Sequence, residues 1–140
     1  MSTSNVNVQP VVAAVGRVLL GALFVISGVQ KLFVPDMIQG YIASVGLPFP
    51  WLVYAITVVI EIGAGALLLI GLRTHLMAWV LAAFTVAAAI LFHRAFGDPN
   101  QAAHFMKNVA IAGGLLHVAA FGAGALSLDD YTLEGRRSPA

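Results

Sequence analysis

The chain has 140 residues, of which 60% are hydrophobic and only 9% are charged, and its formal net charge is +1. Soluble domains usually contain about 25% charged residues, so lipid must be the solvent for much of this protein's surface. The low net charge excludes the basic surface that binds nucleic acid, and we expect no nucleic-acid partner. The sequence has no cysteine, which excludes disulfides, thiolate metal sites and iron–sulfur clusters carried by this chain.

Residues 1–10 are expected to form a polar N-terminal tail, without the charged start of a secretory signal peptide. Four apolar stretches follow, at about residues 11–33, 51–72, 74–92 and 105–126. Each approaches the roughly 20 residues that a helix needs to cross the hydrocarbon core. Only helices satisfy their own backbone hydrogen bonds in lipid, so we predict an all-α membrane protein with a four-transmembrane-helix bundle.

The connections between the predicted spans differ in character. Residues 34–50 join the first two spans and contain an amphipathic stretch, 36–45, that is too short to cross, so we predict a short interfacial helix there. Residues 71–74 join the second and third spans and predict a tight antiparallel pair. Residues 93–104 form a polar link to the fourth span, and residues 129–140 are expected to be a frayed charged tail. One domain over residues 11–128 follows from this pattern.

An even number of spans places both termini on one side of the membrane. The basic residues of that side would be Arg17, Arg73, Arg136 and Arg137, and those of the other side Lys31, Arg94 and Lys107. Because cytoplasmic loops carry an excess of Lys and Arg, this distribution leans toward cytoplasmic termini.

Arg17 and Glu61 fall inside predicted spans, where an ionisable side chain costs a few kcal/mol and usually faces a partner or a cavity. Arg17 shares a helix face with Gly21 and Gly28, which allow close approach of a second helix. The simplest packing brings Arg17 toward Glu61. Such a pair either only fixes the helix register or makes Glu61 a proton-relay or substrate-binding carboxylate in a polar cavity.

His117 lies in the fourth span at a depth similar to that of Glu61, and an antiparallel bundle allows the two side chains to meet. It is either a neutral histidine that hydrogen-bonds across helices, or a proton carrier or ligand of a quinone oxygen. The histidines show neither the spacing of a haem-binding pair nor that of a three-histidine site, so neither haem nor metal is expected.

Further polar residues collect where three predicted helices end, away from the termini. They are Gln30, Lys31, His93, Arg94, His104, Lys107 and Asn108. Their side chains either snorkel to lipid headgroups or form an electropositive mouth. Such a mouth would attract an anion, for example a sulfur oxyanion, or polarise a quinone carbonyl.

Several segments, in their order and spacing, resemble the DoxX family of small four-helix membrane proteins over roughly residues 11–129. They are Gly16-Arg17, Ser27-Gly28-Val29-Gln30-Lys31-Leu32, Gly46-Leu47-Pro48, Glu61-Ile62-Gly63, Phe92-His93, Phe105-Met106-Lys107-Asn108, Gly113-Gly114-Leu115-Leu116 and Ser127-Leu128-Asp129. His117 departs from the family pattern, in which an aliphatic residue is common.

The resemblance implies a subunit of the bacterial inner membrane associated with redox chemistry. Some family members resemble membrane subunits of a thiosulfate:quinone oxidoreductase, and others resemble anchors in complexes that handle thiol or oxidative stress. We therefore expect a homo-oligomer or complex subunit that contacts the quinone pool from the lipid bilayer. Quinone is the expected cofactor, and a soluble redox protein or an anionic sulfur substrate would supply electrons.

In this hypothesis Glu61 accepts protons beside Arg17, while His93 and Lys107 bind the quinone head or an anionic donor. The predicted catalytic residues are Glu61, Arg17 and His93, and the predicted quinone-binding or substrate-binding residues are Lys31, Tyr54, Lys107, Asn108 and His117. The expected wall residues are Phe24, Tyr54 and Trp51. Two alternatives remain: a non-enzymatic scaffold that recruits soluble redox proteins, and a small transporter component.

Overall fold

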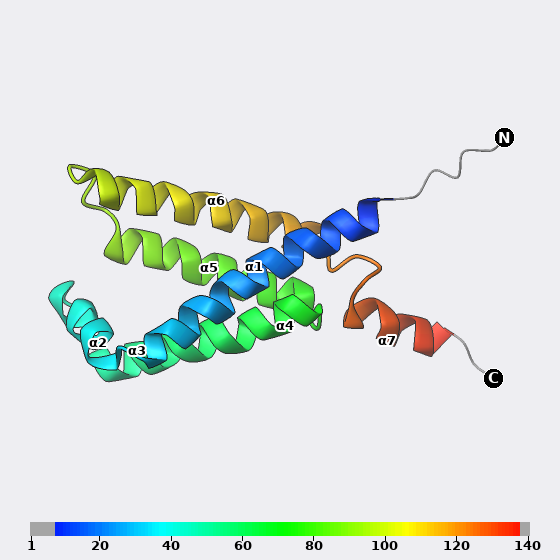
Figure 1. Cartoon of the computed structure of the whole chain (residues 1–140), viewed down its shortest axis with the longest axis horizontal. Coiled ribbons are helices and arrows are strands. Elements are labelled where there is room, and N and C mark those ends of the chain that lie inside the picture. Colours follow the sequence, from blue (N-terminus) through cyan, green and yellow to red (C-terminus); the bar gives the residue numbers. More distant parts are fainter. Residues whose placement is uncertain (1–7, 138–140) are drawn as a thin grey trace.

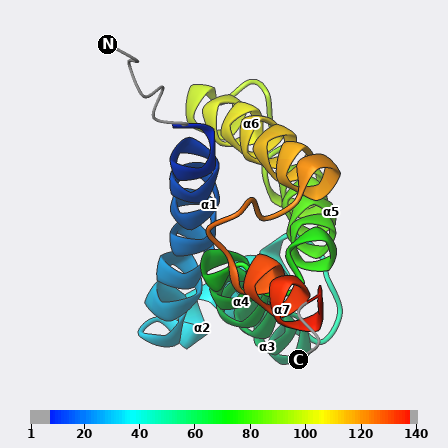
Figure 2. The same ribbon diagram turned by 90° about the vertical axis from the view of Figure 1, so that its right-hand side faces the viewer.

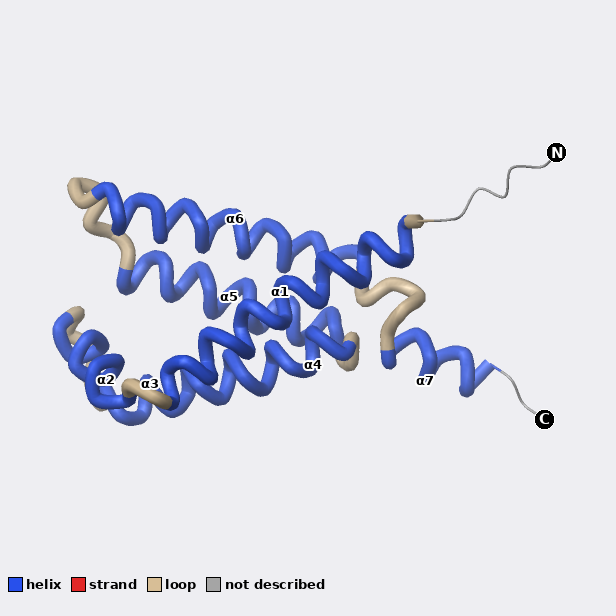
Figure 3. Tube along the Cα trace, viewed as in Figure 1, coloured by secondary structure: helices blue, strands red, loops and turns tan. Residues whose placement is uncertain are grey.

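The computed structural model describes residues 8–137, and this part of the chain is built from helices joined by short connections (Figures 1 and 3). In chain order the elements are α1 (Gln9–Leu32), α2 (Pro35–Ser44), α3 (Pro50–Val59), the π-helical turn η1 (Ile60–Ala64), α4 (Gly65–Ile70), α5 (Thr74–Phe92), α6 (Pro99–Phe121) and α7 (Leu128–Arg137). The elements α3, η1 and α4 form one continuous 21-residue helix, Pro50–Ile70. This helix, α1 and α5 are the three described helices that are long and apolar enough to cross a membrane. The predicted all-helical membrane protein is confirmed at this level.

The long helices run in alternating directions. Figure 1 shows α1 starting at the end of the molecule where α7 lies, Pro50–Ile70 returning to that end, and α5 and α6 forming a second antiparallel pair. We call this end the α7 end and the opposite end, which carries α2 and the α5–α6 connection, the α2 end. The first described residues and the last helix therefore share one end of the bundle.

Glycines bring α1 against the helix Pro50–Ile70. A Cβ built on Gly21 would lie 2.7 Å from the backbone nitrogen of Leu69, and one on Gly65 would lie 2.9 Å from the Cβ of Phe24. Small residues permit such close packing in membranes, where no hydrophobic force drives helices together. Arg17, Gly21, Phe24 and Gly28 are buried, so the expected inward face of α1 is confirmed.

Leucines and alanines form the core between α4, α5 and α6. Leu68, Leu81 and Leu115 are fully buried, and Ala78 and Ala119 are buried beside them. Large apolar side chains also cover the outside of the bundle, as a lipid solvent requires; Leu19, Val59 and Trp79 are examples. Apolar side chains thus form both the buried core and the lipid-facing outside of the bundle.

Three helix boundaries differ from those expected. The helix α1 begins at Gln9, because Pro10 suits a first helical turn. The helix α6 begins at Pro99, where the Asp98 carboxylate accepts a hydrogen bond of 2.9 Å from the Asn100 N–H. The expected C-terminal tail is helical from Leu128 in its described part.

Candidate functional site

The carboxylate of Glu61 is placed by the π-helical turn η1, in the middle of the helix Pro50–Ile70. Glu61 is 5% exposed, and a Cβ built on Gly28 of α1 would lie 3.0 Å from the Cβ of Glu61. A π-helical turn widens the helix locally and is frequent at functional sites. Glu61 is therefore directed into the bundle against α1, on the one part of its helix that is not α-helical.

Lys31 neutralises Glu61. Its Nζ lies 2.8 Å from Oε2 and 3.0 Å from Oε1 of the carboxylate. The hydroxyl of Ser27 donates a hydrogen bond of 3.2 Å to the same Oε1 and accepts one of 2.8 Å from Lys31. Tyr54 supports the network from the other side, because its hydroxyl donates to the Lys31 carbonyl at 3.2 Å. Lys31 also lies in the last turn of α1, where the helix dipole favours a cation.

The expected pairing of Arg17 with Glu61 is wrong. The antiparallel helices bring the later part of α1 to the middle of Pro50–Ile70, so Arg17 lies roughly 20 Å from Lys31 along α1. The Arg17 guanidinium instead donates to two backbone carbonyls, at 2.7 Å to Leu126 and 3.4 Å to Leu68. Arg17 is thus part of the α7 end, not of the carboxylate site.

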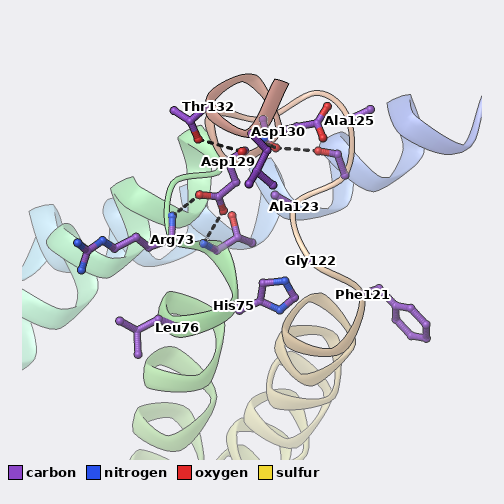
Figure 4. Close-up of a pocket in the computed structure, with 14 residues that line it drawn as sticks. Arg73, His75, Leu76, Phe121, Gly122, Ala123, Ala125, Asp129, Asp130 and Thr132 are labelled. Carbon is purple, nitrogen blue, oxygen red and sulfur yellow. Dashed lines mark hydrogen bonds between the residues drawn. The ribbon is translucent and has the colours of Figure 1, made fainter. Parts of the chain in front are cut away.

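The contacts around Arg17 tie α7 to the bundle. Gly71 has a φ of +73°, and a Cβ there would collide with the Arg17 guanidinium. Its carbonyl accepts a hydrogen bond of 2.8 Å from the Asp129 N–H. The Asp129 carboxylate in turn accepts hydrogen bonds from the N–H groups of Arg73, at 2.7 Å, and Thr74, at 2.8 Å, at the start of α5 (Figure 4).

The environment of Asp129 alters its pKa. Partial burial acts to raise the pKa of the Asp129 carboxyl, but the hydrogen bonds from Thr74 and Arg73, helped by the charge of His75, outweigh it. The resulting pKa lies below its usual value of 3.8. Asp129 is therefore ionised at neutral pH and complements the positive N-terminal end of α5.

A cavity of about 670 Å³ lies beside these contacts at the α7 end. Figure 4 shows the His75 ring facing its middle, with Phe121 directed away from it. The His75 Nδ1–H donates to the Ala119 carbonyl at 2.7 Å. The described residues contain no group of three histidine, aspartate or glutamate side chains placed to hold a metal ion.

A second cavity, of about 540 Å³, lies at the α2 end and contains the Lys31–Glu61 pair. His93 and Asn108 line it as well, from the end of α5 and from α6. Most of the remaining lining is apolar, including the rings of Phe84 and Phe92. Small-molecule sites typically have volumes of about 300–1,000 Å³ and are apolar with a few polar groups. The volume and lining of this cavity fit that description. Four of the residues expected from the sequence thus meet in one cavity.

Other expected residues lie elsewhere. Tyr54 contacts the Lys31 backbone but is not among the residues that line the cavity. Phe24 is buried in the core and Trp51 is 61% exposed, so neither forms the expected wall. Lys107 is exposed and donates to Nδ1 of His104 at 3.1 Å.

The contact between His117 and Glu61 that an antiparallel bundle allowed does not form. The helix α6 buries Ala112, Leu115 and Ala119 against the bundle. His117 lies on another face and is exposed, with its ring centroid 4.5 Å from that of Phe121. The internal polar layer of Arg17, Glu61 and His117 therefore does not form.

Sequence reasoning did not select two residues at the α2-end cavity: Tyr41, which lines it, and Gln101, which contacts the lining residue His93. Tyr41 of α2 lines it, and its hydroxyl donates to the Phe92 carbonyl at 3.0 Å, with ring centroids 5.4 Å apart. Gln101 lies 2.8 Å from Nδ1 of His93 through its Oε1 atom. The amphipathic pattern of residues 36–45 indicated α2, but no sequence signal connected Gln101 with His93.

The sequence model of DoxX matches residues 12–94, which include Lys31, Glu61 and His93. The chain is 36% identical over 127 residues to "Inner membrane protein YphA" of Escherichia coli (strain K12), covering 86% of this chain and 90% of that protein. It is 34% identical over 123 residues to "Inner membrane protein YqjF" of the same organism, covering 88% and 93%. No solved structure matches the chain.

Proposed function

Because the chain belongs to the DoxX family and is a multi-pass protein of the inner membrane, we propose that it binds a quinone from the lipid phase as the membrane subunit of a redox system. The observation that carries this proposal is the Lys31–Glu61 ion pair inside a largely apolar cavity at the α2 end. An ionisable pair within the hydrocarbon region is expensive and usually marks a ligand or proton site.

The proposal includes a fourth membrane span, α6. Its 23 residues correspond to roughly 35 Å of helix, enough to cross the hydrocarbon core. It runs antiparallel to α5, and Met106, Val109 and Leu116 are exposed on its outside, as contact with lipid requires. The helix α2 has only 10 residues and exposes Met37, which suits a position in the membrane interface.

The charge balance of the cavity favours a neutral ligand head. Glu61 neutralises Lys31, so the cavity offers hydrogen-bond donors and acceptors without a net charge. A quinone head fits this chemistry, because its carbonyl oxygens can accept a hydrogen bond from the Asn108 amide and its flat ring packs against Phe84 and Phe92. A sulfur oxyanion would have to compete with Glu61 for Lys31.

In this proposal Glu61 is the residue that exchanges a proton with the bound ligand. It reaches the cavity through η1, and Ser27 hydrogen-bonds to the same carboxylate oxygen. A partner redox protein exchanges electrons with the ligand, since this chain has no cysteine with which to form a thiol relay. Arg17 and His117 lie outside the cavity, so we assign them no part in ligand binding.

The test is equilibrium binding of a decyl-tailed benzoquinone to the purified protein in mild detergent. We expect saturable binding that Glu61→Gln or Asn108→Leu weakens about tenfold, the effect of losing about 1.4 kcal/mol. Lys107→Gln is the matched control, because Lys107 is exposed and does not line the cavity. Excess thiosulfate should not displace the quinone.

Absence of saturable binding, or equal affinities of the wild type and both cavity variants, would contradict the proposal. Thermal unfolding of each variant distinguishes loss of a ligand contact from loss of the fold. If Glu61→Gln unfolds and neither the wild type nor the folded Asn108→Leu variant binds the quinone saturably, the ion pair is structural and a scaffold function is supported instead.

A further inference from the structure

Gln101, in the first turn of α6, holds the imidazole of His93 at the wall of the α2-end cavity. We propose that Gln101 is a positioning residue that fixes the protonation pattern of His93, and that His93 thereby selects a hydroxyl-bearing ligand, the quinol form, over the quinone. The selection part rests on the proposed function, whereas the protonation pattern of His93 is a property of the ligand-free protein.

The first step concerns the proton on Nδ1. Oε1 of Gln101 lies 2.8 Å from Nδ1 of His93. An amide oxygen only accepts hydrogen bonds, so the ring must donate through Nδ1–H. The partner of one ring nitrogen determines which nitrogen carries the proton in a neutral imidazole. Gln101 therefore holds His93 in the tautomer with the proton on Nδ1.

The second step concerns the nitrogen that remains. His93 lines the cavity, and its Nδ1 is engaged by Gln101, so Nε2 is the ring nitrogen available to a ligand. In the neutral Nδ1–H tautomer, Nε2 carries a lone pair and accepts a hydrogen bond. His93 thus adds an acceptor to the cavity, in which the Asn108 amide can donate.

The groups packed around His93 include several basic side chains. The His104 ring stacks on it with centroids 5.1 Å apart, and Nδ1 of His104 accepts a hydrogen bond of 3.1 Å from Lys107. His104 cannot carry two ring protons while it accepts from Lys107. Arg94 follows His93 in sequence and is exposed, and across the cavity Lys31 is paired with Glu61. The stack is thus two imidazole rings beside one lysine.

The third step is the consequence for a ligand. The carbonyl oxygens of a quinone only accept hydrogen bonds, whereas the hydroxyl groups of a quinol also donate them. A quinone oxygen facing Nε2 of His93 places two acceptors together, and a quinol hydroxyl donates to the same atom. A site that hydrogen-bonds a substrate hydroxyl rejects an analogue lacking it. We therefore expect the quinol to bind about tenfold more tightly than the quinone.

The protonation pattern is tested without ligand, by nitrogen-15 NMR of protein labelled at its four histidines, with His93 assigned by the His93→Asn variant. We expect the proton on Nδ1 of His93 in the wild type. Gln101→Glu should retain it, since a carboxylate also accepts, and Gln101→Leu should abolish the preference. Gln30→Leu is the matched control, because Gln30 is an exposed glutamine near the α2 end of α1. A wild-type His93 with its proton on Nε2 would overturn the proposal.

Ligand selection is tested by anaerobic binding of the decyl-tailed benzoquinone and its quinol to the same proteins. The tenfold preference for the quinol should fall toward unity in Gln101→Leu and return in Gln101→Glu. If Gln101→Leu alters the NMR pattern but leaves the preference intact, His93 does not select the ligand. If the wild type binds neither form while the NMR result stands, the proposed function fails and the positioning role of Gln101 survives.

Discussion

At the residue scale, the central relation is the pairing of a buried carboxylate with a lysine whose stem reaches it from the end of α1. Glu61 has 7% side-chain exposure and Lys31 has 22%, so the carboxylate depends on its partner more than the lysine does. Lys31 can still reach the membrane interface along its flexible stem. Substituting Lys31 alone should therefore lower the stability of the fold more than substituting Glu61 alone.

Lys31→Met should lower the free energy of unfolding by about 3–5 kcal/mol, because it leaves the Glu61 carboxylate buried without a counter-charge. The double variant with Glu61→Gln should recover much of this loss, because the unpaired charge is then removed. Denaturant unfolding in detergent, followed by helical circular dichroism, measures both.

Lys107→Met serves as the control and should change the free energy of unfolding by less than about 0.5 kcal/mol, since Lys107 is exposed. Equal stability of Lys31→Met and Lys107→Met would show that the ion pair contributes nothing to the fold.

The sequence predicted which residues are buried better than which residues meet. The spacing of Arg17, Gly21 and Gly28 defined the inner face of α1, but the stagger between two helices follows from three-dimensional packing that the spacing does not encode. As a result, Lys31 and not Arg17 pairs with Glu61. His117 was misplaced for a related reason: both faces of a lipid-embedded helix are apolar, so hydrophobic periodicity does not separate inside from outside.

At the element scale, the approach of α1 to Pro50–Ile70 depends on glycines with neighbouring backbone in contact. We expect Gly21→Ala to lower the free energy of unfolding by about 1–3 kcal/mol, because the added methyl would overlap the backbone of Leu69 and Gly65. Thermal unfolding in detergent checks this.

The matched substitution is Gly113→Ala in α6, where a Cβ would meet nothing within 4 Å. It should raise the stability by up to about 1 kcal/mol through helix propensity alone. A destabilisation as large as that of Gly21→Ala would mean that the two helix surfaces do not differ as described.

The attachment of α7 should depend on pH through Asp129. Because its pKa lies below the usual value of 3.8, the hydrogen bonds to Arg73 and Thr74 stabilise the attachment fully above that value. This stabilisation is lost as the pH falls from about 4 through the lowered pKa. A spin label on Leu133→Cys, at an exposed position, should therefore become more mobile in acid.

Asp129→Asn should give a mobile label already at neutral pH, because an amide lacks the charge that complements the start of α5. Asp130→Asn is the control, since the Asp130 backbone, not its carboxylate, makes the hydrogen bond to Ser127. An Asp129→Asn protein whose label is as immobile at neutral pH as that of the wild type would exclude Asp129 as the attachment.

Element boundaries were predictable to the extent that local chemistry controls them. The apolar stretches located the long helices because span length is a strong signal. The π-helical turn η1 was not foreseen, since an extra residue in one turn leaves the apolar composition unchanged. The helix α7 was missed because its charged residues resemble a solvated tail, and only its contacts with Gly71 and α5 hold it against the bundle.

At the scale of the whole molecule, the alternating helix directions predict membrane sidedness. With four spans, Ser44 and Arg94 lie on one side of the membrane and Leu133 on the other. The protein lacks cysteine, so single cysteines at these exposed positions can be labelled selectively. In intact cells an impermeant maleimide should label Ser44→Cys and Arg94→Cys but not Leu133→Cys, in line with cytoplasmic termini.

Labelling of Leu133→Cys alone would preserve four spans and reverse the orientation. Labelling of Arg94→Cys and Leu133→Cys together, confirmed with a permeant reagent and lysed cells, would show that α6 does not cross. The family and the order of the spans were predictable from the sequence. The assembly of the cavity from α1, α2, α3, η1, α5 and α6 was not, because it depends on contacts between distant segments.

The hydrogen bond from Arg17 to Leu126 has a consequence for the order in which the protein is made. The two residues are 109 positions apart, and Figure 2 shows the linker before α7 crossing the end of the bundle toward α1. The ribosome thus delivers the guanidinium with the first helix and its best acceptor only after α6. Until then, the guanidinium has only the longer of its two hydrogen bonds, to the Leu68 carbonyl. A chain that stops short of residue 126 therefore lacks the shorter of the two hydrogen bonds that hold Arg17.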